Sequence, residues 1–141
     1  MMHMDEWERR AALYGPFLLR VGLATVFLYF GISQLLHPEA FIGWLPKEVS
    51  MLPFSPRTFV VLNGGFEVFF GTLLLAGLFT RVSALLLGLH LFGITLSIGF
   101  SEIGVRDFGL SVATLALVLL GPGAYNLEER LREEPDAPGQ P

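Results

Sequence analysis

Five polar side chains lie within stretches of the sequence that are otherwise apolar. Glu67 is near the middle of one stretch, with Asn63 one helical turn before it, and His90 lies within the next stretch. Arg20 and Gln34 lie in the first stretch. A carboxyl group and an imidazole in a sheltered place can exchange protons, and amides can bind the polar part of a small molecule. We therefore take these five residues as candidate ligand-binding or proton-handling groups.

Glu67 is the strongest of the five candidates. A carboxylate at the centre of a bilayer costs roughly 2.5 to 3.5 kcal/mol on insertion scales, so Glu67 should be protonated or partnered. Its candidate partners are Asn63, His90, Gln34 and Arg20. Ionisable groups within membranes generally mark functional sites. The alternative is that a protonated Glu67 only holds helices together.

The other two ionisable candidates each allow several interpretations. His90 would serve as a haem ligand, a proton relay or a hydrogen-bond partner of a quinone carbonyl, or would simply bond to a neighbouring helix. Arg20 would set the electrostatics of the site or extend to the membrane surface. The adjacent Arg106 and Asp107 suggest an ion pair at a helix boundary, shared with Glu102.

Several classes of chemistry have no signature in the sequence. The chain has no cysteine, which excludes disulfides, thiolate nucleophiles and cysteine-bound metal centres within it, and no metal site is predicted. Phosphate-binding loops, dinucleotide-binding glycine motifs and nucleophile elbows are also absent. The formal net charge of −4 without a basic block gives no basis for nucleic-acid binding.

The elements that carry these residues are predicted to be transmembrane helices. Only 16% of the 141 residues are charged, against about 25% in a typical soluble domain, and mean hydropathy is +0.59. A bilayer core requires roughly 20 apolar residues per helix. Strands usually end after about 4–8 residues, so the length of the apolar stretches favours helices. The spans are expected at about 15–36, 59–79, 82–100 and 105–121.

The predicted fold is an all-α integral membrane four-helix bundle within one domain, residues 15–127. A segment of residues 1–14 precedes it, an apolar connection at 37–58 is expected to lie at the membrane interface or over the mouth of the bundle, and a charged tail at 128–141 is expected to be disordered at its end. One short helix is expected at Glu39–Trp44, anchored by Trp44.

Each span has a stripe of small or polar residues on one helical face, at about 3.6 residues per turn. Such stripes would face a common axis while leucine and phenylalanine face lipid. They comprise Arg20, Ala24, Gly31 and Gln34; Asn63, Glu67 and Gly71; Ser83, His90, Ser97 and Ser101; and Asp107, Ser111, Thr114 and Gly121. The stripes predict a polar column, in which Glu67 and His90 are close enough in depth to share one cavity.

The distribution of basic residues predicts the orientation in the cell membrane. Near the ends of the spans, one side of the membrane would carry five basic residues and the other side three: Arg9, Arg10, Arg81, Arg130 and Arg132 against Lys47, Arg57 and Arg106. Because positive charge favours the cytoplasmic side, both termini are expected in the cytoplasm.

The order of short motifs resembles the DoxX family of small four-helix membrane proteins over about residues 15–127. The matching pieces are Leu19-Arg20, the run from Phe30 to Pro38, Glu67 with Gly71, the run from Gly77 to Ala84, and Gly121-Pro122-Gly123 before an acidic stretch. Gln34 stands where many relatives carry a lysine. The resemblance implies a link to membrane quinone chemistry, since one branch resembles the small subunits of thiosulfate:quinone oxidoreductases.

Three functions remain open from the sequence. The first is a redox-linked subunit that binds quinone, with Glu67 and His90 at its head group, in a homo-oligomer or a larger redox complex. Any enzymatic role would be that of a non-autonomous subunit of a membrane oxidoreductase. The second is a structural or assembly subunit whose polar stripes only pack helices. The third is a small-solute transporter or channel formed by an oligomer.

Overall fold

Four long helices dominate the computed structural model, which describes residues 5–133. They are α1 (Glu6–Leu36), α3 (Pro56–Ala76), α4 (Thr80–Ile98) and α5 (Glu102–Leu120), and all four are long and apolar enough to cross a membrane. The shorter elements are α2 (Glu39–Ile42), η1 (Lys47–Met51) and α6 (Leu127–Arg132). No strand occurs between residues 5 and 133. The predicted all-α membrane four-helix bundle is therefore confirmed.

The helix ends differ from the expected span limits for local reasons. α1 already begins at Glu6, because Glu6 pairs with Arg9 and Arg10 one turn further on, and such pairs support a helix. α5 begins at Glu102, since Ser101 caps it by accepting a hydrogen bond from the Gly104 amide at 3.0 Å.

The segments expected outside the spans also have structure. Residues 39–42 form the short helix α2 where one was predicted, and η1 follows it. The start of the charged tail forms α6, which Asn126 caps at the Glu129 amide. The expected disorder at the end of the tail concerns residues that lie outside the described part of the chain.

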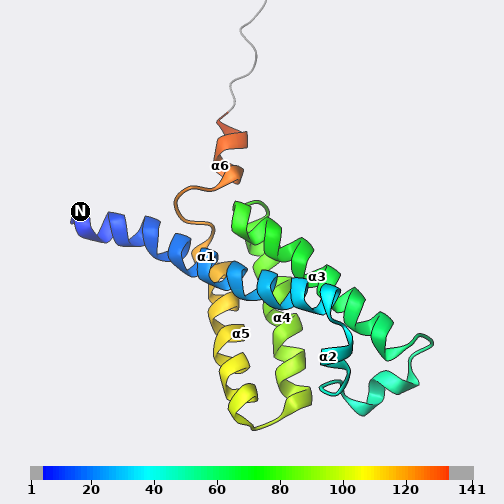
Figure 1. The fold of residues 1–141 in the computed structure, drawn as a ribbon. Helices are drawn as coiled ribbons and strands as arrows, with labels where there is room; N and C mark the ends of the chain where they lie inside the picture. Colours follow the sequence, from blue (N-terminus) through cyan, green and yellow to red (C-terminus); the bar gives the residue numbers. More distant parts are fainter. Residues whose placement is uncertain (1–4, 134–141) are drawn as a thin grey trace, which may run out of the picture.

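The bundle consists of two helix pairs. α1 packs along α3, α4 packs along α5, and the two pairs meet through fewer contacts, α3 against α4 and α1 against α5. Around the bundle the order is therefore α1, α3, α4, α5, with α1 diagonal to α4 and α3 diagonal to α5. Figure 1 shows the α1–α3 pair crossing the α4–α5 pair obliquely, with the pairs diverging toward the connection that contains α2.

A close approach of two glycines joins α1 to α3. A side-chain carbon on Gly31 would lie 2.9 Å from the carbonyl oxygen of Gly64, and one on Gly64 would lie 2.8 Å from that of Gly31. Both positions therefore require glycine. Because the helices are antiparallel, Gly31 lies beside Glu67 and Gly64 beside Gln34. The glycine contact thus brings these two polar side chains together.

The second pair is joined by a buried hydroxyl. Ser111 of α5 donates a hydrogen bond to the carbonyl oxygen of Gly88 of α4 at 2.9 Å. The buried face of α4 consists of Thr80, Ser83, Ala84, Leu87, Gly88, Leu91 and Thr95. The predicted stripe of Ser83, His90, Ser97 and Ser101 is thus only partly inside, since Ser97 and Ser101 are exposed. Apolar packing against α5 sets this face, whereas the stripe followed polarity alone.

The outer surface of the bundle is apolar. Only 28% of the most apolar window of each long helix is buried within the protein, and large side chains such as Tyr29, Phe69, Leu96 and Leu119 point outward. Exposed surface of this kind is unfavourable in water and suits the hydrocarbon core of a bilayer. The chain is a multi-pass membrane protein surrounded by lipid.

Candidate functional site

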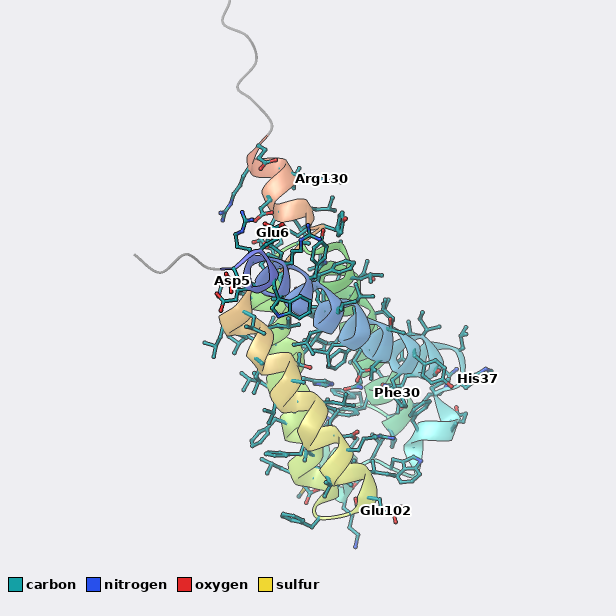
Figure 2. All side chains as sticks on the ribbon, turned by 90° about the vertical axis from the view of Figure 1, so that its left-hand side faces the viewer. Asp5, Glu6, Phe30, His37, Glu102 and Arg130 are labelled. Atoms are coloured by element: carbon teal, nitrogen blue, oxygen red, sulfur yellow. The ribbon has the colours of Figure 1, made fainter. Side chains whose placement is uncertain are left out.

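A cavity of about 690 Å³ lies between the two helix pairs. Its wall is formed by the C-terminal half of α1, the N-terminal half of α3, the C-terminal half of α4 and the N-terminal half of α5, with residues 41–46 beside them. Most of the wall is apolar, as in Val26, Phe27, Phe30, Phe41, Trp44, Phe59, Val60, Leu89, Ile94, Ile98, Ile103 and Leu110. The cavity therefore occupies one end of the bundle, next to the α2 connection. Figure 2 shows Phe30 in the region between α1 and the start of α5 at Glu102.

Glu67 is the centre of a polar cluster in this wall. Its side chain is 4% exposed, and its two carboxylate oxygens accept hydrogen bonds from Gln34 Nε2 and from Asn63 Nδ2, both at 3.1 Å. Asn63 Nδ2 also donates to Gln34 Oε1 at 2.6 Å. The three side chains thus form a closed ring of hydrogen bonds that fixes the orientation of the carboxyl group. Three of the five predicted site residues are brought together here.

His90 is the fourth member of the cluster. Its Nε2 lies 3.5 Å from Glu67 Oε1 but forms no hydrogen bond with any described residue. The imidazole ring packs against Phe66, with the ring centres 4.8 Å apart. The imidazole is therefore near enough to exchange a proton with Glu67, and Nε2 is a buried atom whose hydrogen-bonding capacity no described residue uses.

A second polar group faces the same cavity from α5. Arg106 contacts Asp107 Oδ1 through Nη2 at 2.8 Å and through Nε at 2.9 Å, and Asp107 is 7% exposed. The guanidinium also lies 5.9 Å from the ring centre of Phe30 on α1. The sequence predicted this pair as a rim feature shared with Glu102. Among the described residues, however, Asp107 is the only carboxylate that Arg106 pairs with.

The structure places Arg20 outside the cavity and away from Glu67. It is fully buried, and its guanidinium donates five hydrogen bonds, all to backbone carbonyl oxygens: those of Leu74, Leu75, Pro122, Ala124 and Tyr125. A guanidinium has five N–H donors, so all of them are used. Arg20 is enclosed by protein and does not partner Glu67, because these carbonyls occupy its whole hydrogen-bonding capacity.

An apolar layer separates Arg20 from the cavity. Leu23, Ala24, Phe27, Leu74, Ala84, Leu87, Leu91 and Leu117 form one buried cluster between the two ends of the bundle. The predicted continuous polar column is thus two separate polar sites. The site around Arg20 ties the end of α3 to the segment after α5, and the site around Glu67 lines a cavity that can hold a ligand.

The relationship to known proteins is consistent with this arrangement. The model of the DoxX family matches residues 15–99, which is more than half of the chain. The chain belongs to the DoxX family. The segment that matches the DoxX model contains Arg20, Gln34, Asn63, Glu67 and His90, whereas Arg106 and Asp107 lie beyond it.

One similar protein is the uncharacterized membrane protein Rv3486 of Mycobacterium tuberculosis. It is 27% identical to this DoxX chain over 154 residues, which cover 94% of this chain and 93% of that protein. The name of that protein gives a membrane location and no ligand or activity. No solved structure matches the chain.

Proposed function

We propose that this DoxX-family protein binds a quinone, or a small ligand of the same chemistry, in the cavity beside Glu67. The observation that carries the proposal is a hydrogen-bonded carboxyl group in the wall of a largely apolar cavity of about 690 Å³. Ligand pockets commonly measure about 300–1,000 Å³ and combine apolar walls with a few convergent polar groups. A quinone has a matching division into a polar head group and an apolar tail.

The polar cluster is suited to a head group that takes up and releases protons. Gln34 and Asn63 hold the Glu67 carboxyl group in place, so it need not reorganise when a ligand arrives. The His90 imidazole, 3.5 Å from Glu67 Oε1, would accept or donate a proton at the ligand and share charge with Glu67. Arg20 has no part in this site, and we assign it to the packing of the helix ends.

We further propose that the protein acts as a subunit of a membrane redox assembly, in a homo-oligomer or with other chains. The described residues supply groups for binding and proton transfer. A partner would donate or accept the electrons. In this arrangement both termini lie in the cytoplasm and the cavity opens toward the opposite side of the membrane.

The test is to purify the protein in a mild detergent and analyse its lipid extract and visible spectrum. The proposal predicts quinone in the extract at a substantial fraction of the protein concentration. Glu67→Gln should lower this occupancy by about tenfold, since the hydroxyl of the bound reduced head group loses its charge-assisted hydrogen bond to the carboxylate. Glu102→Gln provides a matched control, because Glu102 is exposed and does not line the cavity.

Other outcomes would favour the remaining functions. A quinone-free protein from quinone-replete membranes would contradict the proposal. If it also carried a stoichiometric partner whose activity Glu67→Gln left intact, the protein would be a structural or assembly subunit. Solute flux in liposomes that Glu67→Gln abolished would indicate a transporter or channel.

A further inference from the structure

We infer that the cavity prefers the reduced ligand, a para-hydroquinone, over the oxidised quinone, with one hydroxyl bound at Glu67 and the other at Asp107. The inference rests on the proposed function, because it concerns the redox form of the ligand in the same cavity. It follows from the chemistry and positions of the two carboxyl groups.

The first step is the position of the two groups. Glu67 comes from α3 and Asp107 from α5, which are diagonal in the bundle, and both line the one cavity. They are 4% and 7% exposed, so neither is a solvated surface group. The para position places the two hydroxyls on opposite sides of an aromatic ring. Two binding groups on different walls of the cavity therefore match a para-hydroquinone better than a ring that carries both hydroxyls on one side.

The second step is the remaining hydrogen-bonding capacity of each group. Each carboxylate oxygen can accept about two hydrogen bonds. Each Glu67 oxygen accepts one, from Gln34 or from Asn63. Both contacts from Arg106 go to Oδ1 of Asp107, and Oδ2 has no hydrogen-bond partner among the described residues. Both carboxyl groups of the cavity wall therefore have acceptor capacity to spare.

The third step is the complementary chemistry of the ligand. A hydroquinone hydroxyl donates to a carboxylate in a short, charge-assisted hydrogen bond. A quinone carbonyl only accepts, so it would face carboxylate oxygens with no proton between them. Both Nδ2 hydrogens of Asn63 are already engaged, by Gln34 Oε1 and Glu67 Oε1, so this amide cannot turn to serve a carbonyl. Unmatched acceptors in a buried site discriminate strongly against the wrong ligand.

Aromatic and aliphatic side chains of the same cavity wall complete the site. Phe27, Phe30 and Ile94 belong to the cavity wall, and Arg106 is held by both Asp107 and the ring of Phe30. The contacts from Arg106 to Oδ1 leave Oδ2 of Asp107 free to accept a hydrogen bond. Arg106 thereby positions the second carboxyl group, whereas Glu67 is positioned by amides.

The experiment is calorimetric titration, without oxygen, of the full-length protein in lipid nanodiscs, with empty nanodiscs as the blank. The probes are a decyl-tailed para-hydroquinone, its monomethyl ether and the corresponding quinone. For the wild type we expect the hydroquinone to bind at least about tenfold more tightly than the quinone, with the monomethyl ether between them, since each hydroxyl contributes one charge-assisted hydrogen bond. This comparison requires no variant.

Asp107→Asn tests the second binding group directly. It should weaken binding of the hydroquinone by about tenfold and leave binding of the quinone unchanged or tighter, because the free Oδ2 acceptor becomes an amide N–H donor while Oδ1 stays with Arg106. Glu102→Gln on the same helix is the control and should change neither. Equal or tighter binding of the quinone by the wild type, or equal weakening of both probes in Asp107→Asn, would overturn the inference. If no probe binds the wild type, the proposed function itself fails.

Discussion

Nε2 of His90 lies 3.5 Å from Oε1 of Glu67, yet the two groups share no hydrogen bond. The imidazole is held instead by its packing against Phe66, while Gln34 and Asn63 hold the carboxyl group. Two groups that can carry a proton are thus adjacent, and each is positioned by other residues. A ligand that bonded to Glu67 would therefore break no hydrogen bond between the two groups.

Replacing the imidazole should separate its packing from its chemistry. His90→Phe keeps an aromatic ring against Phe66, so the free energy of unfolding should change by less than about 1 kcal/mol. The affinity for the hydroquinone should fall by about tenfold, because a hydrogen-bonding group beside Glu67 is lost. Thermal unfolding and calorimetric titration measure the two quantities. Unchanged affinity in a folded His90→Phe variant would remove His90 from the site.

The glycine contact between α1 and α3 gives a prediction with a neighbouring control. A methyl group at position 64 would lie 2.8 Å from the Gly31 carbonyl oxygen, so Gly64→Ala must force the helices apart. We expect a loss of about 1–3 kcal/mol in unfolding free energy. Gly65 has no atom within 4 Å of such a methyl group, so Gly65→Ala should be neutral or stabilising by up to about 1 kcal/mol. Equal effects of the two substitutions on thermal unfolding would contradict the close contact.

Arg20 and Arg81 form a second matched pair. Both donate hydrogen bonds to backbone carbonyls near helix ends, but Arg20 is fully buried and Arg81 is exposed. Arg20→Met should destabilise the protein by at least about 3 kcal/mol, since several buried carbonyls lose their donor. Arg81→Met should cost about 1 kcal/mol or less, because water can replace the side chain. Denaturation in detergent measures the unfolding free energy of both variants. A loss in Arg20→Met no larger than in Arg81→Met would contradict the structural role of the buried arginine.

The position of Arg20 marks the limit of what the sequence could reveal. Hydropathy was enough to predict the four helices, and helical periodicity placed Asn63 and Glu67 on one face. The partners of Arg20 are carbonyl oxygens, which every residue carries, so no side-chain pattern could identify them. The residue in the sequence that could have indicated this site is Gly77, which ends α3 in a left-handed conformation. A side-chain carbon there would lie 2.5 Å from Arg20 Nη1.

The sequence placed Asp107 on the inward-facing stripe of the last span but did not identify it as a site residue. The sequence placed Arg106 and Asp107 near the start of a span whose beginning was uncertain, and an adjacent pair at a boundary is typical of an exposed rim. In the structure the capped start at Ser101 and the divergence of the helix pairs bring Asp107 into the cavity wall. Tertiary packing decides such a case, because residues one turn apart share a helix face, and only packing determines whether that part of the face is covered.

The orientation in the membrane can be tested by single cysteines, since the natural chain has none. Residues 5 and 6 and Arg130 lie at the same end of the bundle, opposite Glu102 (Figure 2). We expect Lys47→Cys to react with a membrane-impermeant maleimide in intact cells. Glu8→Cys and Arg130→Cys should react only after permeabilisation. Labelling of Glu8→Cys in intact cells would reverse the proposed topology.

Photolabelling with a short-tailed azidoquinone, mapped by mass spectrometry, tests most directly whether the cavity is the ligand site. The proposed function predicts label on cavity-lining residues of at least two helices, such as Phe30 and Ile94, suppressed by an excess of unlabelled hydroquinone and reduced in Glu67→Gln but not in Glu102→Gln. Label confined to lipid-facing residues such as Phe69 and Leu96, and insensitive to competitor, would contradict it.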